Sequence, residues 1–487
     1  MFTKEIIITL PFMILLYEFC FLRISSGLNW KRILPFFIIS LIVPLVLFYT
    51  SSENSRKMIQ LLKSAPDIPR WNYLLTQPRV MITYLRLLFI PLNQNLDYDY
   101  PVTHTFFEPP VLASFLFLLV ILTAAIRIFH KHRLIAFAIF YFFLTLLPES
   151  SVVPLADVIF EHRLYLPMLG YSIFLVTIMY YLFKNKNLGV VILILIISGY
   201  AILTYSRNFA WQDDITLSKD LTLKSAKKPR TYVQLGNAYA KKKMYNQAIE
   251  SLIKATELAP NYSEAYYNLG GVYYEKNDPD KAIFYLNQAI QLDPLDFQAY
   301  YFRGMSFGDK KEYAQAIADF NQALRLNPKY IESYRALAYT YQAIKNNDEA
   351  IIVYNKAIAI NPGVAEVYIY AAEFCNGIGK YQMAMDLCKI ALKINPNSHA
   401  VHFNLGYTYE NMGNFDQAIK SFQKALTINP DSGSTYNLLS WAYYNIKNYN
   451  LAIQYYDKAI QLGYPANPNF LESLKNTNRK QTQNTQI

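Results

Sequence analysis

Hydrophobic and polar positions follow two different patterns along this chain, and the change falls near residue 207. Before it, apolar residues form long runs with few interruptions. After it, apolar residues recur at helical spacing between polar ones, which is typical of helices that bury one face. The sequence therefore predicts an all-α protein: a polytopic transmembrane helix bundle over residues 1–207, followed by a soluble helical domain.

Six apolar runs in the first part approach the ~20 residues that a helix needs to cross a bilayer. They cover residues 6–22, 31–50, 110–129, 134–148, 164–183 and 188–206, and the fourth is the shortest. Basic residues gather around the short connections after the first, third and fifth runs: Arg23, Lys31, Arg32, Arg127, Lys131, Arg133, Lys184 and Lys186. Because basic loops stay in the cytoplasm, we expect an integral protein of a bacterial inner membrane. The loops 51–109 and 149–163 and everything after residue 207 then lie on the extracytoplasmic side.

The outer loop 51–109 contains a second helical signal. Residues 71–91 are rich in aromatic and leucine residues, contain Pro78 and are interrupted by Arg79 and Arg86. This pattern favours an amphipathic helix lying on the outer leaflet. The alternative is a seventh span, which would reverse the orientation of everything after it.

The second part has an exact internal period. Pro260, Pro294, Pro328, Pro362, Pro396 and Pro430 follow one another at intervals of 34 residues. A period of 34 is typical of the tetratricopeptide repeat, a helix–turn–helix unit that stacks into an α-solenoid. The alignment predicts seven repeats over residues 229–466, a linker at 208–228, and a cap and disordered tail at 467–487, with Phe470 and Leu471 at the start of the cap.

Small residues recur at fixed positions of the seven repeats, where they allow two helices to approach closely. The twentieth and twenty-seventh positions are always alanine, as in Ala282 and Ala289, and the eighth is Gly, Ala or Ser. Each unit buries its apolar face only against its neighbours. This agreement predicts the packing of the whole solenoid.

The first helix of each repeat is expected to line the inner face of the solenoid. Its fifth and ninth positions carry aromatic residues and little charge, which suits an extended peptide, a protein segment or a glycan. The alternative is ordinary packing between repeats. The predicted groove residues are Asn237, Tyr267, Tyr301, Arg335, Tyr339, Phe403, Tyr407 and Trp441.

The chain has three cysteines, too few for a disulfide framework. Cys375 and Cys388 occupy facing positions of the fifth repeat. Packing of two small buried thiols is the favoured interpretation, and a disulfide is chemically permitted outside the cytoplasm.

The net charge of +11 does not indicate nucleic acid, because the basic residues are spread over membrane loops and repeat surfaces rather than gathered in one patch. The motifs of metal sites, nucleophile elbows and phosphate-binding glycine loops are not recognisable. The sequence thus identifies no cofactor and no metal ligand.

The segment EHRLYLP, Glu161 to Pro167, is the strongest candidate for chemistry in the first part. It stands at the outer end of the fifth span, where Arg163 suits a lipid-linked phosphate and Glu161 suits its orientation. Tyr165 belongs to the same candidate site. Secondary candidates on the outer side are Lys4, Glu5, Asp97 and Asp99. The alternative for all of them is anchoring of long side chains at the interface.

Three stretches and their order resemble a known family. They are TKEIIITLPFMILLYEF at 3–19, YLRLLFIPLNQNLDYDYP at 84–101 and EHRLYLPMLGYSIF at 161–174, followed by the repeats. Together they resemble the transmembrane-and-tetratricopeptide-repeat O-mannosyltransferases and their bacterial relatives. The resemblance implies a C-type glycosyltransferase-like bundle that transfers a sugar from a polyprenyl phosphate to a protein hydroxyl. It also implies that Glu161 and Arg163 lie near the donor phosphate and that the repeats present the acceptor.

The chain departs from this family at its beginning. The catalytic acidic residue of that fold lies in the first outer loop, after the first span, whereas this chain starts at the segment with Lys4 and Glu5. No residue is therefore assigned as catalytic base, and we expect a chain truncated at the N-terminus. Two functions follow: a protein derived from a lipid-linked-sugar glycosyltransferase, or a non-catalytic membrane-tethered scaffold for protein–protein interaction. Membrane lipid and a peptide or protein are the predicted partners.

Overall fold

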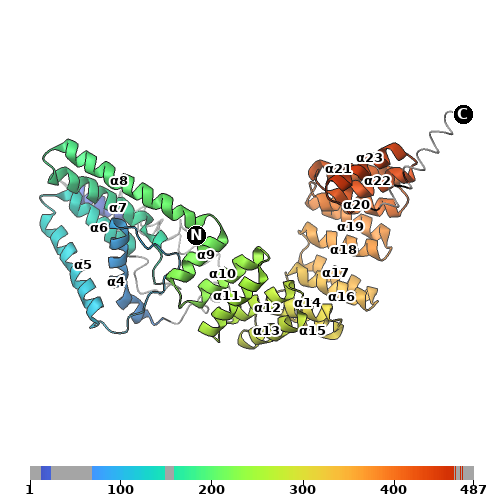
Figure 1. The fold of residues 1–487 in the computed structure, drawn as a ribbon, viewed down its shortest axis with the longest axis horizontal. Helices are drawn as coiled ribbons and strands as arrows, with labels where there is room; N and C mark the ends of the chain where they lie inside the picture. Colours follow the sequence, from blue (N-terminus) through green and yellow to red (C-terminus); the bar gives the residue numbers. More distant parts are fainter. Residues whose placement is uncertain are drawn as a thin grey trace. The chain divides into compact units, whose positions relative to one another are not determined.

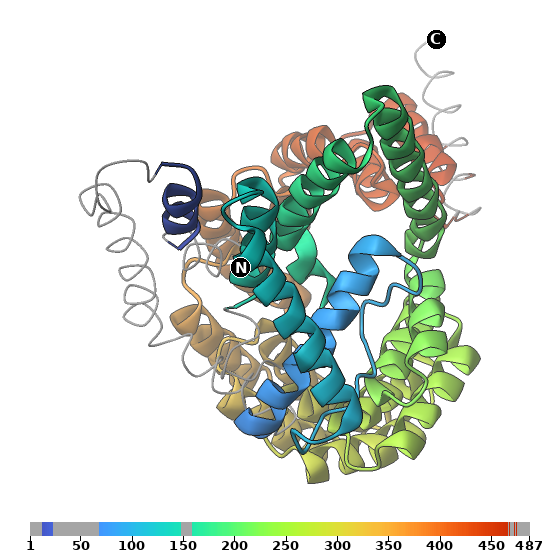
Figure 2. The ribbon, with the colours of Figure 1, turned by 90° about the vertical axis from the view of Figure 1, so that its left-hand side faces the viewer.

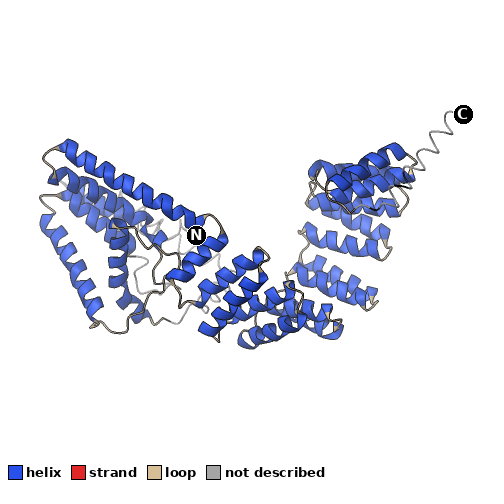
Figure 3. Ribbon diagram, in the orientation of Figure 1, coloured by secondary structure: helices blue, strands red, loops and turns tan. Residues whose placement is uncertain are grey.

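The computed structural model describes residues 12–22, 68–147, 158–465, 467, 472 and 474. The regular elements in these residues are helices (Figures 1 and 3). The chain divides into two compact units, Met1–Pro260 and Asn261–Ile487. The all-α prediction is confirmed for the described residues.

The first unit is a group of helices followed by the first repeat; its helices run from blue to green in Figure 2. A short helix from Phe12 ends in the π-helix η1 (Glu18–Leu22). The elements that follow are α4 (Arg70–Phe89), α5 (Pro109–Ile128), α6 (Arg133–Leu146), η2 (Glu161–Leu164), α7 (Tyr165–Leu182), α8 (Lys186–Asn208), η3 (Phe209–Trp211), α9 (Asp214–Lys224), α10 (Pro229–Lys241) and α11 (Tyr245–Leu258).

Three described helical stretches are long and apolar enough to cross a membrane: Pro109–Ile128, Glu161–Leu182 and Lys186–Trp211. They correspond to the predicted spans 110–129, 164–183 and 188–206. The predicted span 134–148 is the shorter helix α6, and residues 12–22 of the predicted span 6–22 are helical. The predicted span 31–50 lies outside the described residues.

The segment predicted as an amphipathic helix at 71–91 is the helix α4. It buries one face, with Tyr73, Val80 and Tyr84 at most 1% exposed, against Phe142 of α6 and Tyr171 of α7. Trp71 stands on the opposite side and is 65% exposed. The helix is thus part of the core of the first unit, and its place relative to a lipid surface stays a prediction.

The segment predicted as a linker at 208–228 contains helix α9. The carboxylate of Asp213 caps its start by accepting hydrogen bonds from the backbone N–H groups of Ile215 and Thr216, both at 2.9 Å. Leu221 on this helix is 1% exposed. The segment is therefore a folded element that leads directly into the first repeat.

Fourteen helices form seven antiparallel pairs, as the 34-residue period predicts. The first pair is α10 and α11. The others are α12 (Ser263–Glu275) and α13 (Pro279–Leu292), α14 (Phe297–Asp309) and α15 (Tyr313–Leu326), α16 (Ile331–Ala343) and α17 (Asn347–Ile360), α18 (Ala365–Gly377) and α19 (Tyr381–Ile394), α20 (His399–Asn411) and α21 (Phe415–Ile428), and α22 (Gly433–Asn445) and α23 (Tyr449–Gln461).

Packing inside a pair requires the small residues that the sequence repeats. A Cβ added at Gly270 would lie 2.5 Å from Cγ of Leu286, whereas one added at the neighbouring Gly271 would meet nothing within 4 Å. Ala282 and Ala289 are fully buried on the facing helix. The eighth position is therefore small because the second helix of the pair lies directly against it.

Cys375 and Cys388 are buried free thiols in the fifth repeat, in agreement with the packing interpretation. Burial raises the pKa of Cys388 to about 12 and also raises that of Cys375. Both side chains are thus held as neutral thiols.

The chain after the last repeat also contacts the solenoid. The backbone N–H of Asn467 donates to the Tyr456 hydroxyl at 2.6 Å, and Leu474 is fully buried in the same cluster. Phe470, Leu471 and the tail 476–487, which the sequence predicts as cap and disordered end, lie outside the described residues.

Candidate functional site

The EHRL turn η2 is hydrogen-bonded to loop 91–103. The Glu161 carboxylate accepts a hydrogen bond from the Asn95 backbone N–H at 2.6 Å and from the Tyr98 hydroxyl at 2.5 Å. Burial, and then the neighbouring carboxylate, raise the pKa of Tyr98 far above its ordinary value, so the phenol stays a donor. Glu161 thereby holds residues 95–98 against the start of α7.

Arg163 lies inside the first unit and is 8% exposed. Its guanidinium contacts the Val158 carbonyl oxygen at 3.5 Å and lies 5.0 Å from the centre of the Phe160 ring. Tyr165, by contrast, is 76% exposed. The three predicted phosphate-site residues thus differ in their surroundings, and their role toward a phosphate stays a prediction.

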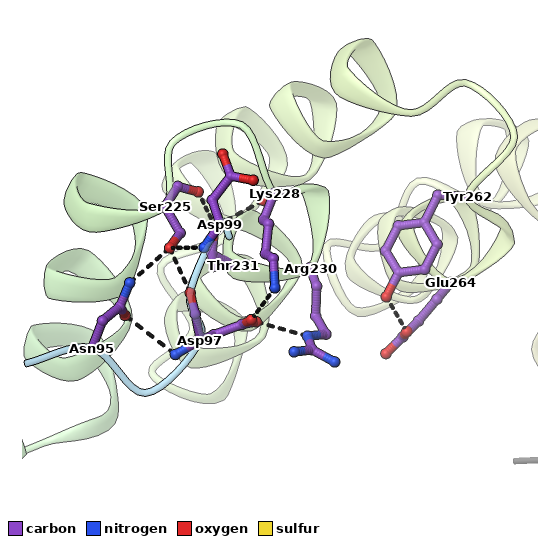
Figure 4. Close-up of polar contacts among 9 residues, drawn as sticks. All are labelled: Asn95, Asp97, Asp99, Ser225, Lys228, Arg230, Thr231, Tyr262 and Glu264. Atoms are coloured by element: carbon purple, nitrogen blue, oxygen red, sulfur yellow. Dashed lines mark hydrogen bonds and ion pairs between the residues drawn. The ribbon is translucent and has the colours of Figure 1, made fainter. Parts of the chain in front are cut away.

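Asp97 is the centre of a polar cluster, shown in Figure 4. Its carboxylate is 4% exposed and pairs with Lys228 Nζ at 2.6 Å and Arg230 Nε at 2.7 Å. Burial alone would raise the pKa of Asp97, but the hydrogen bonds from Arg230 and Lys228 outweigh it and hold the pKa below its ordinary value. Asp97 is therefore a charged anchor for the segment that enters α10.

Ser225 joins the same two segments through its hydroxyl. Ser225 Oγ donates to the Asp97 carbonyl oxygen at 2.5 Å and accepts from Asn95 Nδ2 at 2.8 Å and from the Asp99 backbone N–H at 3.2 Å. We call Asn95, Asp97, Ser225, Lys228 and Arg230 the loop clamp. It fastens loop 91–103 to the first repeat, and all of its members belong to the first unit.

The sequence did not single out Asn95, Ser225, Lys228 or Arg230. Asn95 and Ser225 carry no signal in the sequence, and the run with Lys227, Lys228 and Arg230 at the start of the first repeat is the one feature that could have pointed to the two basic members. Asp99, predicted together with Asp97, has an exposed carboxylate and takes part through its backbone. Lys4 and Glu5, the other secondary candidates, lie outside the described residues.

An apolar crevice of about 540 Å³ lies among α4, α5, α6 and α7. Leu, Ile, Phe and Ala side chains form almost all of its wall, and Arg86 is its one charged lining residue. The Arg86 guanidinium also donates to the Leu92 carbonyl oxygen at 3.1 Å. Arg86 thus contributes apolar atoms to the wall while its guanidinium contacts the loop after α4, and the crevice itself suits a long apolar group.

Two pockets of the second unit lie along the first helices of its repeats. The first, of about 380 Å³, is lined by the predicted groove residues Tyr301, Arg335 and Tyr339. Arg335 pairs with Glu332 at 2.8 Å, and its guanidinium lies 4.7 Å from the centre of the Tyr370 ring. The arginine is thereby held in place beside the pocket.

The second pocket, of about 500 Å³, is lined by Phe403 and Tyr407, which the sequence also predicts, and by Glu373 and three asparagines: Asn376, Asn404 and Asn437. Trp441 is 39% exposed on α22, and Tyr267 packs against Phe302 with ring centres 5.8 Å apart. Asn237 is exposed on α10, in the first unit. The structure thus places five of the eight predicted groove residues in pockets.

Family models of the tetratricopeptide repeat match residues 228–294, 297–330, 331–363, 399–432 and 433–462. The chain contains tetratricopeptide repeats. The predicted repeat segment 229–466 and the pairs α10 to α23 agree with these matches.

Solved structures similar to this chain are tetratricopeptide repeat proteins as well. One from Parabacteroides merdae has 17% identity and a TM-score of 0.41, over 51% of this chain and 98% of that one. MamA has 26% identity and a TM-score of 0.29, over 33% and 93% of the two chains. YrrB, described as a TPR protein with an unusual peptide-binding site, has 22% identity and a TM-score of 0.29, over 38% and 94%. No curated protein matches the chain.

The tetratricopeptide repeats make this part of the chain a surface for interaction with other proteins. In the part of the chain that the structure describes, no group of three His, Cys, Asp or Glu residues is placed to hold a metal ion. The two pockets on the repeats are lined by aromatic, amide and small or apolar side chains with a few charged ones.

Proposed function

We propose that this protein is a membrane-tethered scaffold whose tetratricopeptide repeats bind an extended segment of a partner protein. The observation that carries the proposal is the pair of pockets along the first helices of the repeats, lined by Tyr301, Arg335, Tyr339, Phe403 and Tyr407. Rigid aromatic side chains provide contact area at low entropic cost. Successive pockets on one face suit a ligand that runs along several repeats.

The composition of the first unit supports the tether. Helix α8 is apolar on all sides: Ile194, Leu195 and Ile202 are 56%, 65% and 67% exposed. In water such a helix would leave a large apolar surface uncovered, whereas lipid would cover it. The basic residues between α5 and α6 and between α7 and α8 favour a cytoplasmic position for both connections. We accordingly place the repeats on the extracytoplasmic side.

Photo-cross-linking tests the scaffold directly. With benzoylphenylalanine at Tyr339 or at Tyr407 of the full-length protein in its native membrane, we expect cross-links to one and the same partner protein, mapped by mass spectrometry to a short segment. Ile352 on α17 is 56% exposed on a second helix and provides the matched control. If Ile352 cross-links to that partner equally well, the pockets on the first helices are not the binding site.

A second candidate function rests on the crevice among α4, α5, α6 and α7. Its apolar wall suits a polyprenyl chain, and Arg86 beside it suits a phosphate. Together with the resemblance to O-mannosyltransferases, this supports an origin in an enzyme that uses a polyprenyl-phosphate-linked sugar. Glu161, Arg163 and Tyr165 remain the residues that the resemblance implies near the phosphate.

Arg86 is a cleaner test of this candidate than Arg163, whose side chain is buried against Val158 and Phe160. We expect Arg86→Ala to weaken binding of undecaprenyl phosphate to the purified protein about five- to tenfold, because one charge-assisted contact contributes roughly 1–1.5 kcal/mol. Native mass spectrometry of the complex measures this. Arg127→Ala, an exposed arginine on α5 that does not line the crevice, is the control. Equal affinity of the wild type and both variants would argue against a phosphate at Arg86.

A further inference from the structure

The pocket of the last three repeats is unusual because its wall contains three buried amides. Asn376, Asn404 and Asn437 are 6%, 4% and 8% exposed. They come from three successive first helices, α18, α20 and α22, and all of them line the same cavity. We call this cavity, with Glu373, Phe403 and Tyr407, the amide pocket.

The hydrogen bonds around the amide pocket leave one donor without an acceptor. Asn404 Nδ2 donates to Glu373 Oε1 at 3.1 Å, and Asn437 Nδ2 donates to the Tyr464 hydroxyl at 3.3 Å. Asn376 Oδ1 accepts from Thr408 Oγ1 at 3.0 Å, but Nδ2 of Asn376 has no acceptor among the described residues. A buried donor without an acceptor destabilises the folded state. Because Nδ2 is closed to solvent here, a carbonyl oxygen of a ligand would supply the missing acceptor once the Asn376 amide turns toward the pocket.

The charges on these helices have one sign. Helices α18, α20 and α22 contain three glutamates, Glu366, Glu373 and Glu410, and no Lys or Arg. In the described part of the repeats, no Lys or Arg forms an ion pair with Glu373. Glu373 is only partly buried and stands in the wall of the pocket. A ligand that enters here therefore meets a carboxylate that accepts from Asn404 but has no Lys or Arg paired with it in the described repeats.

We propose that the amide pocket binds an extended peptide segment through its main chain and pairs a Lys or Arg of that segment with Glu373. This rests on the proposed function, in which the repeats bind a partner protein, and it adds the chemistry of that partner. Asn376 donates to a main-chain carbonyl, and the rings of Phe403 and Tyr407 cover the stem of the basic side chain. A neutral glycan would stack on the same rings but would bring no cation to Glu373.

Selection of octapeptides from a displayed random library on the full-length protein in detergent micelles tests this. We expect the enriched peptides to share a Lys or Arg at one position. One of them, made synthetically, should bind Glu373→Gln about tenfold more weakly than the wild type. Its version with norleucine in place of that residue should bind both proteins equally. Asn376→Ala should weaken both peptides alike, because it removes a main-chain contact.

Glu366→Gln, which changes an exposed carboxylate at the start of α18 outside the pocket, serves as the matched control and should bind like the wild type.

Enriched peptides without a shared basic residue would overturn the inference and leave the scaffold intact. So would equal affinity of the basic peptide for Glu373→Gln and the wild type. Binding of maltoheptaose to the wild type that is lost in Asn376→Ala, without any enriched peptide, would assign the pocket to a glycan instead. A library that yields no peptide also overturns the inference, and the cross-linking from Tyr339 and Tyr407 then decides on the scaffold separately.

Discussion

Replacement of Asp97 by alanine is expected to lower the local stability of the first repeat and loop 91–103 by about 2–4 kcal/mol. The Asp97 carboxylate is almost fully buried and pairs with both Lys228 and Arg230. Removing one partner of a buried ion pair costs about 3–5 kcal/mol. The loss expected here is smaller than that range, because the side chains of Lys228 and Arg230 are already 23% and 41% exposed. Water therefore replaces part of the lost interaction.

Hydrogen exchange of α10 and of loop 91–103 in the full-length protein measures this local opening. Asp99→Ala is the matched control, because the Asp99 carboxylate is exposed in the same loop, and its effect should stay within about 0.5 kcal/mol. The depressed pKa of Asp97 also sets a pH dependence. Its contribution to stability is complete above the ordinary pKa of a free aspartate and is lost as the pH falls through the lower folded-state pKa. Equal protection in the two variants would show that the loop clamp contributes nothing to stability.

Replacement of Glu410 by glutamine is expected to stabilise the sixth and seventh repeats at pH 8 by about 2 kcal/mol. Burial raises the pKa of Glu410 from 4.5 to about 7, and Oε2 of its carboxyl has no hydrogen-bond partner among the described residues. A shift of this size corresponds to about 3 kcal/mol between the neutral and the charged form. Glutamine avoids the charge but buries an amide, which reduces the gain.

The stability contributions of Glu410 and Asp97 change with pH in opposite directions. Because the folded-state pKa of Glu410 is raised, its contribution is complete below pH 4.5 and is lost as the pH rises through about 7. The wild type should therefore be less stable at pH 8 than at pH 5.5, and Glu410→Gln should show a smaller difference. Amide exchange of α20 and α22, corrected for the intrinsic rate at each pH, measures it. Asp457→Asn, an exposed carboxylate on α23, should leave the dependence unchanged. A wild type that is as stable at pH 8 as at pH 5.5 would contradict the prediction.

The loop clamp also bears on the proposed scaffold. Loop 91–103 is joined to η2 through Glu161 and to the start of α10 through Asp97 and Ser225. Lys224 adds a contact to the Gln94 carbonyl oxygen at 2.7 Å, and Arg207 at the end of α8 pairs with Asp220 on α9. The first repeat is thus fastened to the helices of the first unit by polar contacts as well as by the chain itself.

Five of the residues that line the two repeat pockets could be predicted from the sequence, but the three buried asparagines could not. The fifth and ninth positions of the first helices place Tyr301, Arg335, Tyr339, Phe403 and Tyr407 on one face, because a helical repeat turns equivalent positions to equivalent sides. The asparagines of the amide pocket stand at different positions of their repeats: Asn376 at the twelfth, Asn404 at the sixth and Asn437 at the fifth. Aligning the repeats position by position therefore does not group the three asparagines. They line one pocket because α18, α20 and α22 stack against one another.

By itself, the sequence determined the repeats, their 34-residue units and the small residues inside each pair, because these depend on contacts within 34 residues or with the adjacent unit. The apolar helices of the first unit were equally evident from length and composition. Tertiary structure alone decided what the isolated polar residues do. Asp97 meets Lys228 and Arg230 across 131 and 133 residues, and Glu161 meets Asn95 across 66. The role of a carboxylate depends on the groups that folding places beside it. When those groups are this far apart in the sequence, no local sequence pattern predicts the pairing.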